Sequence, residues 1–400
     1  MSTIVPSEVR SFLAPDIAER VPFSDSLLNR VVQNIFQIAS YLTDPVCKIR
    51  EYYWRLAIVD SLNPIAYKLS NRIRKLALCI GIFGWVSLAV VTFVPGLGLR
   101  TLGIFLQKES FIHLQESKEA QKLPPNRSFS LLSWNVCCVE AGYSISNGGV
   151  LPWSFRIDKI IEKIFEKNAD VTCLYEVFDP KTAFYISSRL KQYGYGHFYF
   201  HMNPKAIGLP SGIFVASKYK THNPEFFPFP QDSLVGTTKY ASKGVFSCTL
   251  KSQGEDFARI LCTHLQHSEI PQKPTCEEIE ARQKQMKIVV DRIDRCRVHC
   301  IVVTGDLNLE NKEYNKSSWQ ALFQKGDRFA NELKTWDGDT FCAQLVGQQV
   351  SAPLNLDHTM ILKDTAKTIE TNLVETGYEA AIFKEDALSD HKGLFSIITL

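Results

Sequence analysis

Short apolar runs in the last two-thirds of the chain each stop on a polar residue of a kind that binds metal ions or phosphate. Strands that pack side by side bring their ends to one rim of a sheet, so the polar groups of six predicted strands are expected to converge. A single asparagine or aspartate at a strand end is usually a turn residue. The prediction of a shared site therefore depends on the whole set of polar residues. Its members are Asn135, Glu176, His264, Asp306, Asn308, Asp357, Asp390 and His391.

The stretch from residue 128 to residue 400 alternates such apolar runs with amphipathic segments. The runs FSLLSWNV, DVTCLYEV, GVFSCTL and CIVVTGDLN are typical of strands, and RIDKIIEKIFEK and EEIEARQKQMKIVVDRI have helical periodicity. Several strands follow one another in the middle of this stretch. The pattern therefore predicts a mixed, layered α/β domain rather than a doubly wound dinucleotide-binding fold.

The segment GDLN is the most specific of the single motifs. Asp306 and Asn308 point to the same side of an extended chain. Gly305 is expected to let a neighbouring backbone or a ligand approach closely.

The residue types in the set suit the cleavage of a phosphate ester. Mg²⁺ prefers oxygen ligands and keeps several waters, so one or two carboxylates are enough to hold it. We expect Glu176 to bind the ion directly, with Asn135 beside it. A histidine moves protons near neutral pH, and we expect Asp357 to fix the tautomer of His391, which should lie at an exposed strand end. No His/Cys cluster has zinc spacing.

The first 117 residues have a different texture and are expected to be helical. Residues 76–99 contain no charged side chain over 24 positions, and a membrane-spanning helix needs about 20. Basic residues flank this run on both sides, which leaves its orientation open. Pro95 and Gly96 interrupt it late, so a re-entrant hairpin competes with a span, and a buried helix of a soluble domain is the third alternative.

Two helices are expected ahead of the apolar run. One begins with Ser24 as its cap, and the other extends from about Pro45 to Leu62. Residues 118–127 are polar, contain two adjacent prolines and are expected to link the N-terminal region to a domain at residues 128–400.

Composition limits the partners and the compartment. The net charge is only +3 and no Lys/Arg-rich stretch accompanies the motifs, so there is no strong signal for nucleic-acid binding. The 11 cysteines form no CxxC pair, and their odd number argues against a disulfide framework. We therefore expect free thiols and a reducing, cytoplasmic compartment for the catalytic part. The segment MSTIVPSEVR is not typical of a cleavable signal peptide.

The ordered motifs SWNV, EVF, THLQ, GDLN, LDH and SDH resemble those of the endonuclease/exonuclease/phosphatase superfamily across residues 128–400. The resemblance implies a four-layered α/β sandwich like that of deoxyribonuclease I and in-line hydrolysis that depends on Mg²⁺, with Mn²⁺ as the alternative ion. It further implies the following roles by motif position. The metal ligand would be Glu176 with Asn135, Asp306 and Asp390 close by, the base His391 oriented by Asp357, and the phosphate-binding groups His264 and Asn308.

Within the superfamily the neutral sphingomyelinases are the most similar. CLYEVFD, SGIFVASKY, ASKGVF and CTHLQ with a later Arg-x-x-Gln helix match their motifs. This implies a membrane-associated phospholipase C that hydrolyses sphingomyelin to ceramide and phosphocholine. A nuclease, a phosphoinositide phosphatase and a catalytically silent binding protein are the alternatives.

Three positions near the motifs raise questions of their own. Lys243 in the ASKG loop is expected either to contact a substrate phosphate or to be a solvated loop lysine. Tyr175 stands where many relatives have Gln or Asn, which removes one polar group from the site. His358 replaces the commoner Tyr or Arg after Asp357, so the wall of the pocket is expected to differ.

Overall fold

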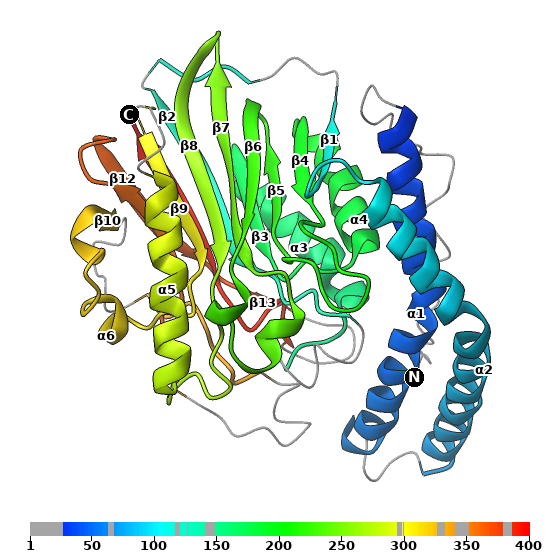
Figure 1. Ribbon diagram of the computed structural model, residues 1–400. Helices are drawn as coiled ribbons and strands as arrows, with labels where there is room; N and C mark the ends of the chain where they lie inside the picture. The colour runs from blue at the N-terminus through cyan, green and yellow to red at the C-terminus, as the bar shows by residue number, and fades with distance from the viewer. Residues whose placement is uncertain are drawn as a thin grey trace.

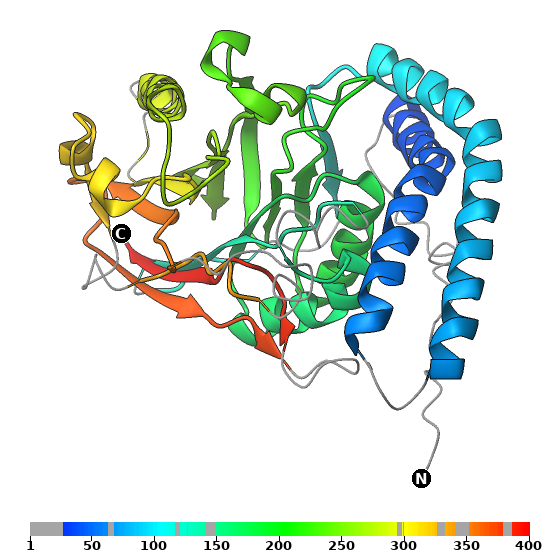
Figure 2. The same cartoon turned by 90° about the horizontal axis from the view of Figure 1, so that it is seen from below.

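Two β-sheets face each other and are covered by helices on their outer faces in the computed structural model of this chain (Figures 1 and 2). The structure describes residues 27–62, 68–116, 121–125, 127–140, 149–293, 298, 300–325, 333–340, 352–378 and 386–400. The expected cap at Ser24 and positions 118–120 and 126 of the expected linker lie outside these residues.

The two large sheets have seven and six strands. The first has the order β1 (Ile112–Gln115), β4 (His197–Phe200), β5 (Phe214–Ser217), β3 (Val171–Tyr175), β2 (Ser128–Asn135), β15 (Gly393–Thr399) and β12 (Thr368–Val374). The second has the order β10 (Phe323–Lys325), β11 (Asp357–Leu362), β9 (Cys300–Asp306), β8 (Glu255–His264), β7 (Gly244–Ser252) and β6 (Lys220–Pro228). A separate short pair joins β13 (Gly377–Tyr378) to β14 (Asp386–Ala387).

Helices complete the layers. The first sheet carries α3 (Trp153–Lys167) and α4 (Pro180–Leu190), and the second carries α5 (Cys276–Ile293) and the short α6 (Asn311–Tyr314). Single 3₁₀ turns lie at η2 (Lys191–Tyr193), η3 (Gln231–Ser233), η4 (Gly236–Tyr240) and η5 (Gln320–Leu322).

Alternation along the strands fills the two sides of each sheet. On β2, Leu132 and Trp134 pack under the helices, whereas Phe129 and Leu131 pack between the sheets. Helix α3 buries isoleucines at helical spacing against the same sheet. The expected four-layered α/β sandwich is confirmed.

Two parallel strand pairs bring the functional residues to one rim. β2 pairs with β3, and β8 pairs with β9 so that His264 lies opposite Asp306. The expectation that apolar runs end at Asp357 and His391 is wrong, because β11 begins at Asp357 and β15 begins two residues after His391. Both strands run antiparallel to the strands beside them, so their starts lie next to the ends of β9 and β2.

A long helical hairpin lies beside the sandwich (Figures 1 and 2). The prediction of a new helix at Pro45 is wrong, because α1 (Leu27–Leu62) continues through that residue. A proline inside a helix removes one backbone donor and crowds the carbonyl four residues earlier. Contacts with α2 (Lys68–Leu106) support α1 against this cost. Helix α2 likewise continues through Pro95. Lys181 of α4 forms a 2.7 Å ion pair with Asp44 of α1.

Small residues let α1 and α2 approach each other. A Cβ atom on Gly96 would lie 2.9 Å from Cγ2 of Thr43, and one on Gly103 would lie 3.0 Å from the Phe36 ring. The rest of α2 is largely open: the stretch Asn71–Leu106 is long and apolar enough to cross a membrane by length and composition, and only 6% of its most apolar window is buried. The alternative of a buried helix is therefore wrong for these residues.

The division of the chain around residues 118–127 stays a prediction. Strand β1 precedes that segment, within the range expected to be helical, and pairs with β4 at the edge of the first sheet. The backbone N–H of Gln121 donates to the carbonyl of Lys218 at 3.0 Å.

Gly305 permits the close approach of β8 and β9 at the rim. An added Cβ atom would collide with the backbone carbonyl of Thr263, which is the partner of Gly305 in the strand register. We expect Gly305→Ala to lower the free energy of unfolding by about 1–3 kcal/mol or more, as measured by chemical denaturation. Gly196→Ala is the matched control, since nothing lies within 4 Å of its Cβ position. Equal stability of the two variants would contradict this explanation.

Candidate active site

The side-chain amide of Asn135 joins the two sheets at the rim. Its Nδ2 atom donates to Oε1 of Glu176 at 3.1 Å and to Oδ2 of Asp306 at 2.9 Å. Its Oδ1 atom accepts from the backbone N–H of Cys137 at 3.0 Å. Asn135 is 1% exposed, so these contacts fix the amide between two carboxylates from different sheets.

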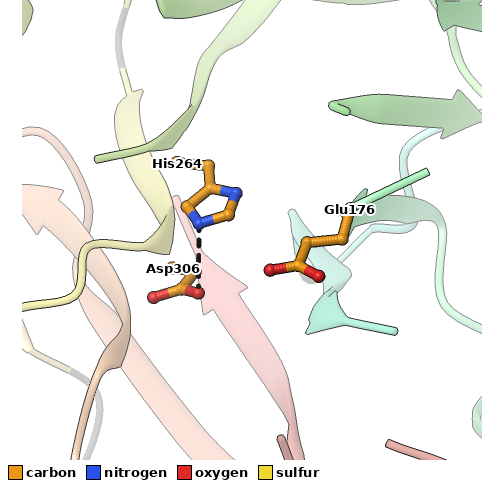
Figure 3. Close-up of side chains that lie close together, drawn as sticks. All are labelled: Glu176, His264 and Asp306. Carbon is orange, nitrogen blue, oxygen red and sulfur yellow. Dashed lines mark ion pairs between the residues drawn. The ribbon is translucent and has the colours of Figure 1, made fainter. Parts of the chain in front are cut away.

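Glu176 follows β3 in a left-handed backbone conformation, with φ of 64°. Such a conformation is uncommon for a residue other than glycine and tends to occur at functional sites. It turns the carboxylate towards Asp306 and His264 (Figure 3). Burial and the nearby Asp390 raise the pKa of Glu176 to about 7.

Asp306 at the end of β9 lies at the centre of the site. Its Oδ2 atom is 3.4 Å from Nε2 of His264 and 3.7 Å from Nε2 of His391. Burial favours the protonated form, but His391, His264 and Asn135 outweigh it and lower the pKa of Asp306. Burial lowers the pKa of His264 well below its usual value, and Lys243 lowers it further.

His391 and Asp357 form a buried pair. Nδ1 of His391 and Oδ2 of Asp357 are 2.7 Å apart, as the sequence predicted. The expectation that His391 is exposed is wrong, since its exposed fraction is 5%. Burial opposes the charge on His391, yet Asp357, Asp306 and Asp390 raise its pKa well above the usual value. Burial raises the pKa of Asp357 to about 6.

Asn308 and Lys243 both reach the loop that follows β8. The backbone carbonyl of Leu265 accepts from Nζ of Lys243 at 3.1 Å and from Nδ2 of Asn308 at 3.5 Å. Lys243 is 5% exposed, so the alternative of a solvated loop lysine is wrong. Burial lowers the pKa of Lys243 to about 8.

Asp390 lies at the edge of this arrangement. Its Oδ2 atom accepts from Nε1 of Trp336 at 3.2 Å. Its charge contributes to the pKa values of Glu176 and His391. Among the described residues, the groups of ionisable side chains at metal-ligand spacing are Glu176 with His264 and Asp306, and Asp306 with Asp357 and His391. These groups contain Glu176 but do not include Asp390.

The two departures from the family pattern, Tyr175 and His358, bond to backbone carbonyls rather than to the polar side chains of the site. Tyr175 is fully buried between the sheets, and its hydroxyl donates to the carbonyl of Thr304 at 3.0 Å. The His358 ring bonds to the carbonyl of Leu309 at 2.7 Å and stacks on Tyr314. Tyr175 thus fills the core and His358 supports the chain after the GDLN segment.

Sequence reasoning missed three residues that position the site. Nε1 of Trp134 donates to the carbonyl of His391 at 2.8 Å. The hydroxyl of Thr335 accepts from the backbone N–H of Asp357 at 3.0 Å. Trp336 holds Asp390. Only Trp134 carried a signal, because it directly precedes Asn135 in a predicted strand; residues 333–340 lie in no element.

The donor set fits a hard divalent cation. The carboxylates of Glu176 and Asp306 converge on the amide of Asn135, and carboxylate oxygens are ligands that suit Mg²⁺. Burial and the charge of Asp390 oppose the ionisation of Glu176, and a bound cation would offset this effect. The Nδ1 atom of His264 and the Oδ1 atom of Asp357 are buried without a protein partner among the described residues. Such orphaned polar atoms favour a bound group or ordered water at this point.

The raised pKa of Glu176 predicts a pH-dependent metal affinity. Its folded-state pKa of about 7 lies above the usual 4.5. Without metal, the folded state therefore holds a proton that the unfolded state releases, and the free energy of unfolding falls as pH rises from about 4.5 to about 7. Mg²⁺ requires the ionised carboxylate, so calorimetry should show binding that tightens up to about tenfold per pH unit below about pH 7. A pH-independent Kd would contradict this.

Solved structures with a similar fold match about two-thirds or more of the chain. SmcL is 20% identical over 68% of this chain and 99% of that chain, with a TM-score of 0.55. The beta toxin of Staphylococcus aureus, solved with bound magnesium ions, is 19% identical over 67% of this chain and 99% of that chain, with a TM-score of 0.54. TDP2 from C. elegans is 14% identical over 80% of this chain and 85% of that chain, with a TM-score of 0.50. No protein-family model matches the chain.

The sandwich and its strand-end residues thus give the chain the fold of the endonuclease/exonuclease/phosphatase superfamily. SmcL is a sphingomyelinase and the beta toxin a neutral sphingomyelinase, and both belong to that superfamily, as does TDP2. These likenesses establish the fold, and the resemblance seen in the sequence motifs is to the same group.

Proposed function

We propose that this chain is a Mg²⁺-dependent phosphodiesterase that hydrolyses sphingomyelin to ceramide and phosphocholine. The observation that carries the proposal is the amide of Asn135, which holds Glu176 and Asp306 together beside the His391–Asp357 pair. The residues that we propose as ion ligand and as proton-transferring group thus share one buried cluster. Phosphodiester hydrolysis needs both of these.

Each group has a defined role in the proposal. Glu176 would hold the cation, with Asn135, Asp306 and Asp390 as the neighbouring groups. The bound cation would stabilise charge on the non-bridging oxygens of the phosphate. Asp357 holds Nδ1 of His391, so that Nε2 faces Asp306 and the reacting water. Asp306 and Asp390 help to keep His391 protonated, and with their charge offset by the cation Nε2 would be free to take one proton of the water that attacks phosphorus. The bond between phosphorus and the ceramide oxygen breaks, and that oxygen takes up a proton from solvent water.

The remaining groups act on the phosphate. In the strand register His264 and Asp357 lie on either side of Asp306. His264 and Asn308 are proposed to donate hydrogen bonds to the phosphate oxygens. Lys243 is charged at neutral pH given its pKa of about 8 and is proposed to add a positive charge to the same side. Its bond to Leu265 ties it to the loop that also carries the Asn308 contact.

A lipid substrate is favoured over nucleic acid by the charge of the chain and by the motifs shared with neutral sphingomyelinases. A net charge of +3 gives no general attraction for a polyanion. We propose a membrane-associated protein whose catalytic domain lies in a reducing, cytoplasmic compartment. The nine cysteines recorded for the described residues are all free thiols, which supports this location.

A parallel substrate assay tests the proposal. The full chain is incubated with Mg²⁺ and sphingomyelin vesicles, phosphoinositide vesicles, or DNA, and phosphocholine, inorganic phosphate and nucleotides are measured. Glu176→Gln is run beside it to exclude contaminating activity. We expect Mg²⁺-dependent release of phosphocholine that the variant lacks. Release of nucleotides or of inorganic phosphate alone would reject sphingomyelin in favour of a nuclease or a phosphatase, and no release at all would reject catalysis.

A further inference from the structure

One side of α2 exposes large apolar side chains over its whole length. Ile80, Val91 and Phe105 are 64%, 70% and 85% exposed, and Phe83, Val90 and Val94 are between 72% and 76% exposed. We call these six residues the apolar face of α2. Soluble monomers rarely leave so large an apolar area in water.

The charge of α2 indicates what covers this face. The helix contains Lys68, Arg72, Arg74, Lys75 and Arg100 and no aspartate or glutamate. Arg72 and Arg74 are exposed at the end of the helix nearest the start of the apolar face. Apolar side chains flanked by basic ones suit the interface of an anionic bilayer, where the acyl chains and the phosphate groups are both within reach.

The packing of the hairpin decides how α2 meets the membrane. Tyr52 of α1 lies against Gly81, and Phe36 of α1 lies against Gly103. The 22 residues between these two points rise about 33 Å, which matches the hydrocarbon thickness of about 30 Å. A perpendicular span would therefore place residues 36–52 of α1 inside the hydrocarbon together with α2.

That same stretch of α1 is fixed to the catalytic domain by polar groups. Asp44 pairs with Lys181 at 2.7 Å, and Ser40 donates to Asp179 at the start of α4. Cys47 lies 2.6 Å from a carboxylate oxygen of Glu140. A span would take these ionic groups and the adjacent helices of the sandwich into the bilayer, at a cost of several kcal/mol per charge. The sandwich lies along the hairpin in both views (Figures 1 and 2).

We propose that α2 lies along the surface of an anionic bilayer with its apolar face at the boundary of head groups and acyl chains. Helix α1 then forms the layer between α2 and the catalytic domain. Neither the span nor the re-entrant hairpin applies, since α2 is one continuous helix through Pro95 and its partner α1 is bound to the sandwich. This inference does not depend on the proposed catalytic activity.

Vesicle binding tests the choice of partner. The full chain is titrated with vesicles of phosphatidylcholine and phosphatidylserine and with vesicles of phosphatidylcholine alone. We expect R72E/R74E to weaken binding to the anionic vesicles at least about tenfold, because each basic residue near such a surface contributes about 1 kcal/mol. K312E/K316E makes the same charge change at exposed positions in and just after α6, on the far side of the molecule (Figure 1), and should bind as the parent does. Equal losses in both variants would overturn the assignment to α2.

A depth measurement tests the orientation. Single cysteines at Ile80, Val91 and Phe105, in a background with the other reactive cysteines replaced by serine, are labelled with a fluorophore and quenched by nitroxide lipids of different depths. Residues 80 and 105 are about 38 Å apart along the helix. We expect all three probes at one shallow depth. A deep Val91 between two probes at opposite surfaces would establish a span. Three probes in water, with a dimer in solution, would show that a second copy covers the face.

Discussion

His391→Ala is expected to lower the rate of Mg²⁺-dependent phosphodiester hydrolysis by about 10²- to 10⁴-fold, the usual contribution of a general base. The reason is geometric: Asp357 holds Nδ1 of His391 at 2.7 Å, which leaves Nε2 as the proton acceptor beside Asp306. The rate is measured at saturating Mg²⁺, together with the thermal midpoint of each protein. A residual rate above about a tenth of the parent rate would contradict the assignment.

Two controls separate catalysis from folding in this experiment. His391 is buried, so alanine also leaves Asp357 without a partner, and His391→Asn is included because it fills part of the space and can still donate to Asp357. His222→Ala removes a partly exposed imidazole that pairs with Asp256 on the second sheet, away from the rim. We expect both His391 variants to be inactive at temperatures where they are folded, and His222→Ala to retain the parent rate.

Glu176→Gln is expected to raise the Mg²⁺ concentration for half-maximal activity by at least about 100-fold. Even groups that only support a metal ligand change metal affinity by about 10- to 100-fold, and Glu176 is the carboxylate that we place on the ion itself. The glutamine keeps the volume and an acceptor for Asn135 but removes the charge. Metal titrations of activity and of calorimetric binding measure the effect.

Glu162→Gln is the matched control for this prediction, since Glu162 is an exposed carboxylate on α3 that pairs with the surface residue Lys159. Its metal titration should coincide with that of the parent. If the titration of Glu176→Gln also coincides with the parent, Glu176 is not the ligand.

The sequence predicted the sandwich and most of the residues at its rim, because most of the motifs lie where strands end. Asn135, His264 and Asp306 each close a strand, and Glu176 follows one directly, so the pattern and the structure agree at these four positions. Strand direction was not readable from an apolar run, and Asp357 proved to open its strand rather than close it. Asp357 still lies at the predicted rim, because the start of an antiparallel strand lies beside the end of its neighbour.

Other features depended on contacts between distant segments. The continuity of α1 through Pro45 rests on the packing of α2 and α4, which local propensity does not record. The contact between Trp336 and Asp390 comes from a segment with no periodicity. Tyr175 and His358 are both buried and bond to the backbone carbonyls of distant residues, which the sequence alone does not reveal.

The central claim is that residues far apart in the sequence surround one hydrated divalent cation. Anomalous diffraction from crystals soaked in Mn²⁺ tests it most directly, because Mn²⁺ replaces Mg²⁺ at oxygen-rich sites and scatters strongly enough to be located. We predict a peak about 2 Å from a carboxylate oxygen of Glu176, with Asn135 and Asp306 near it. A fully occupied Mn²⁺ elsewhere in the molecule, with no peak beside Glu176, would contradict the account.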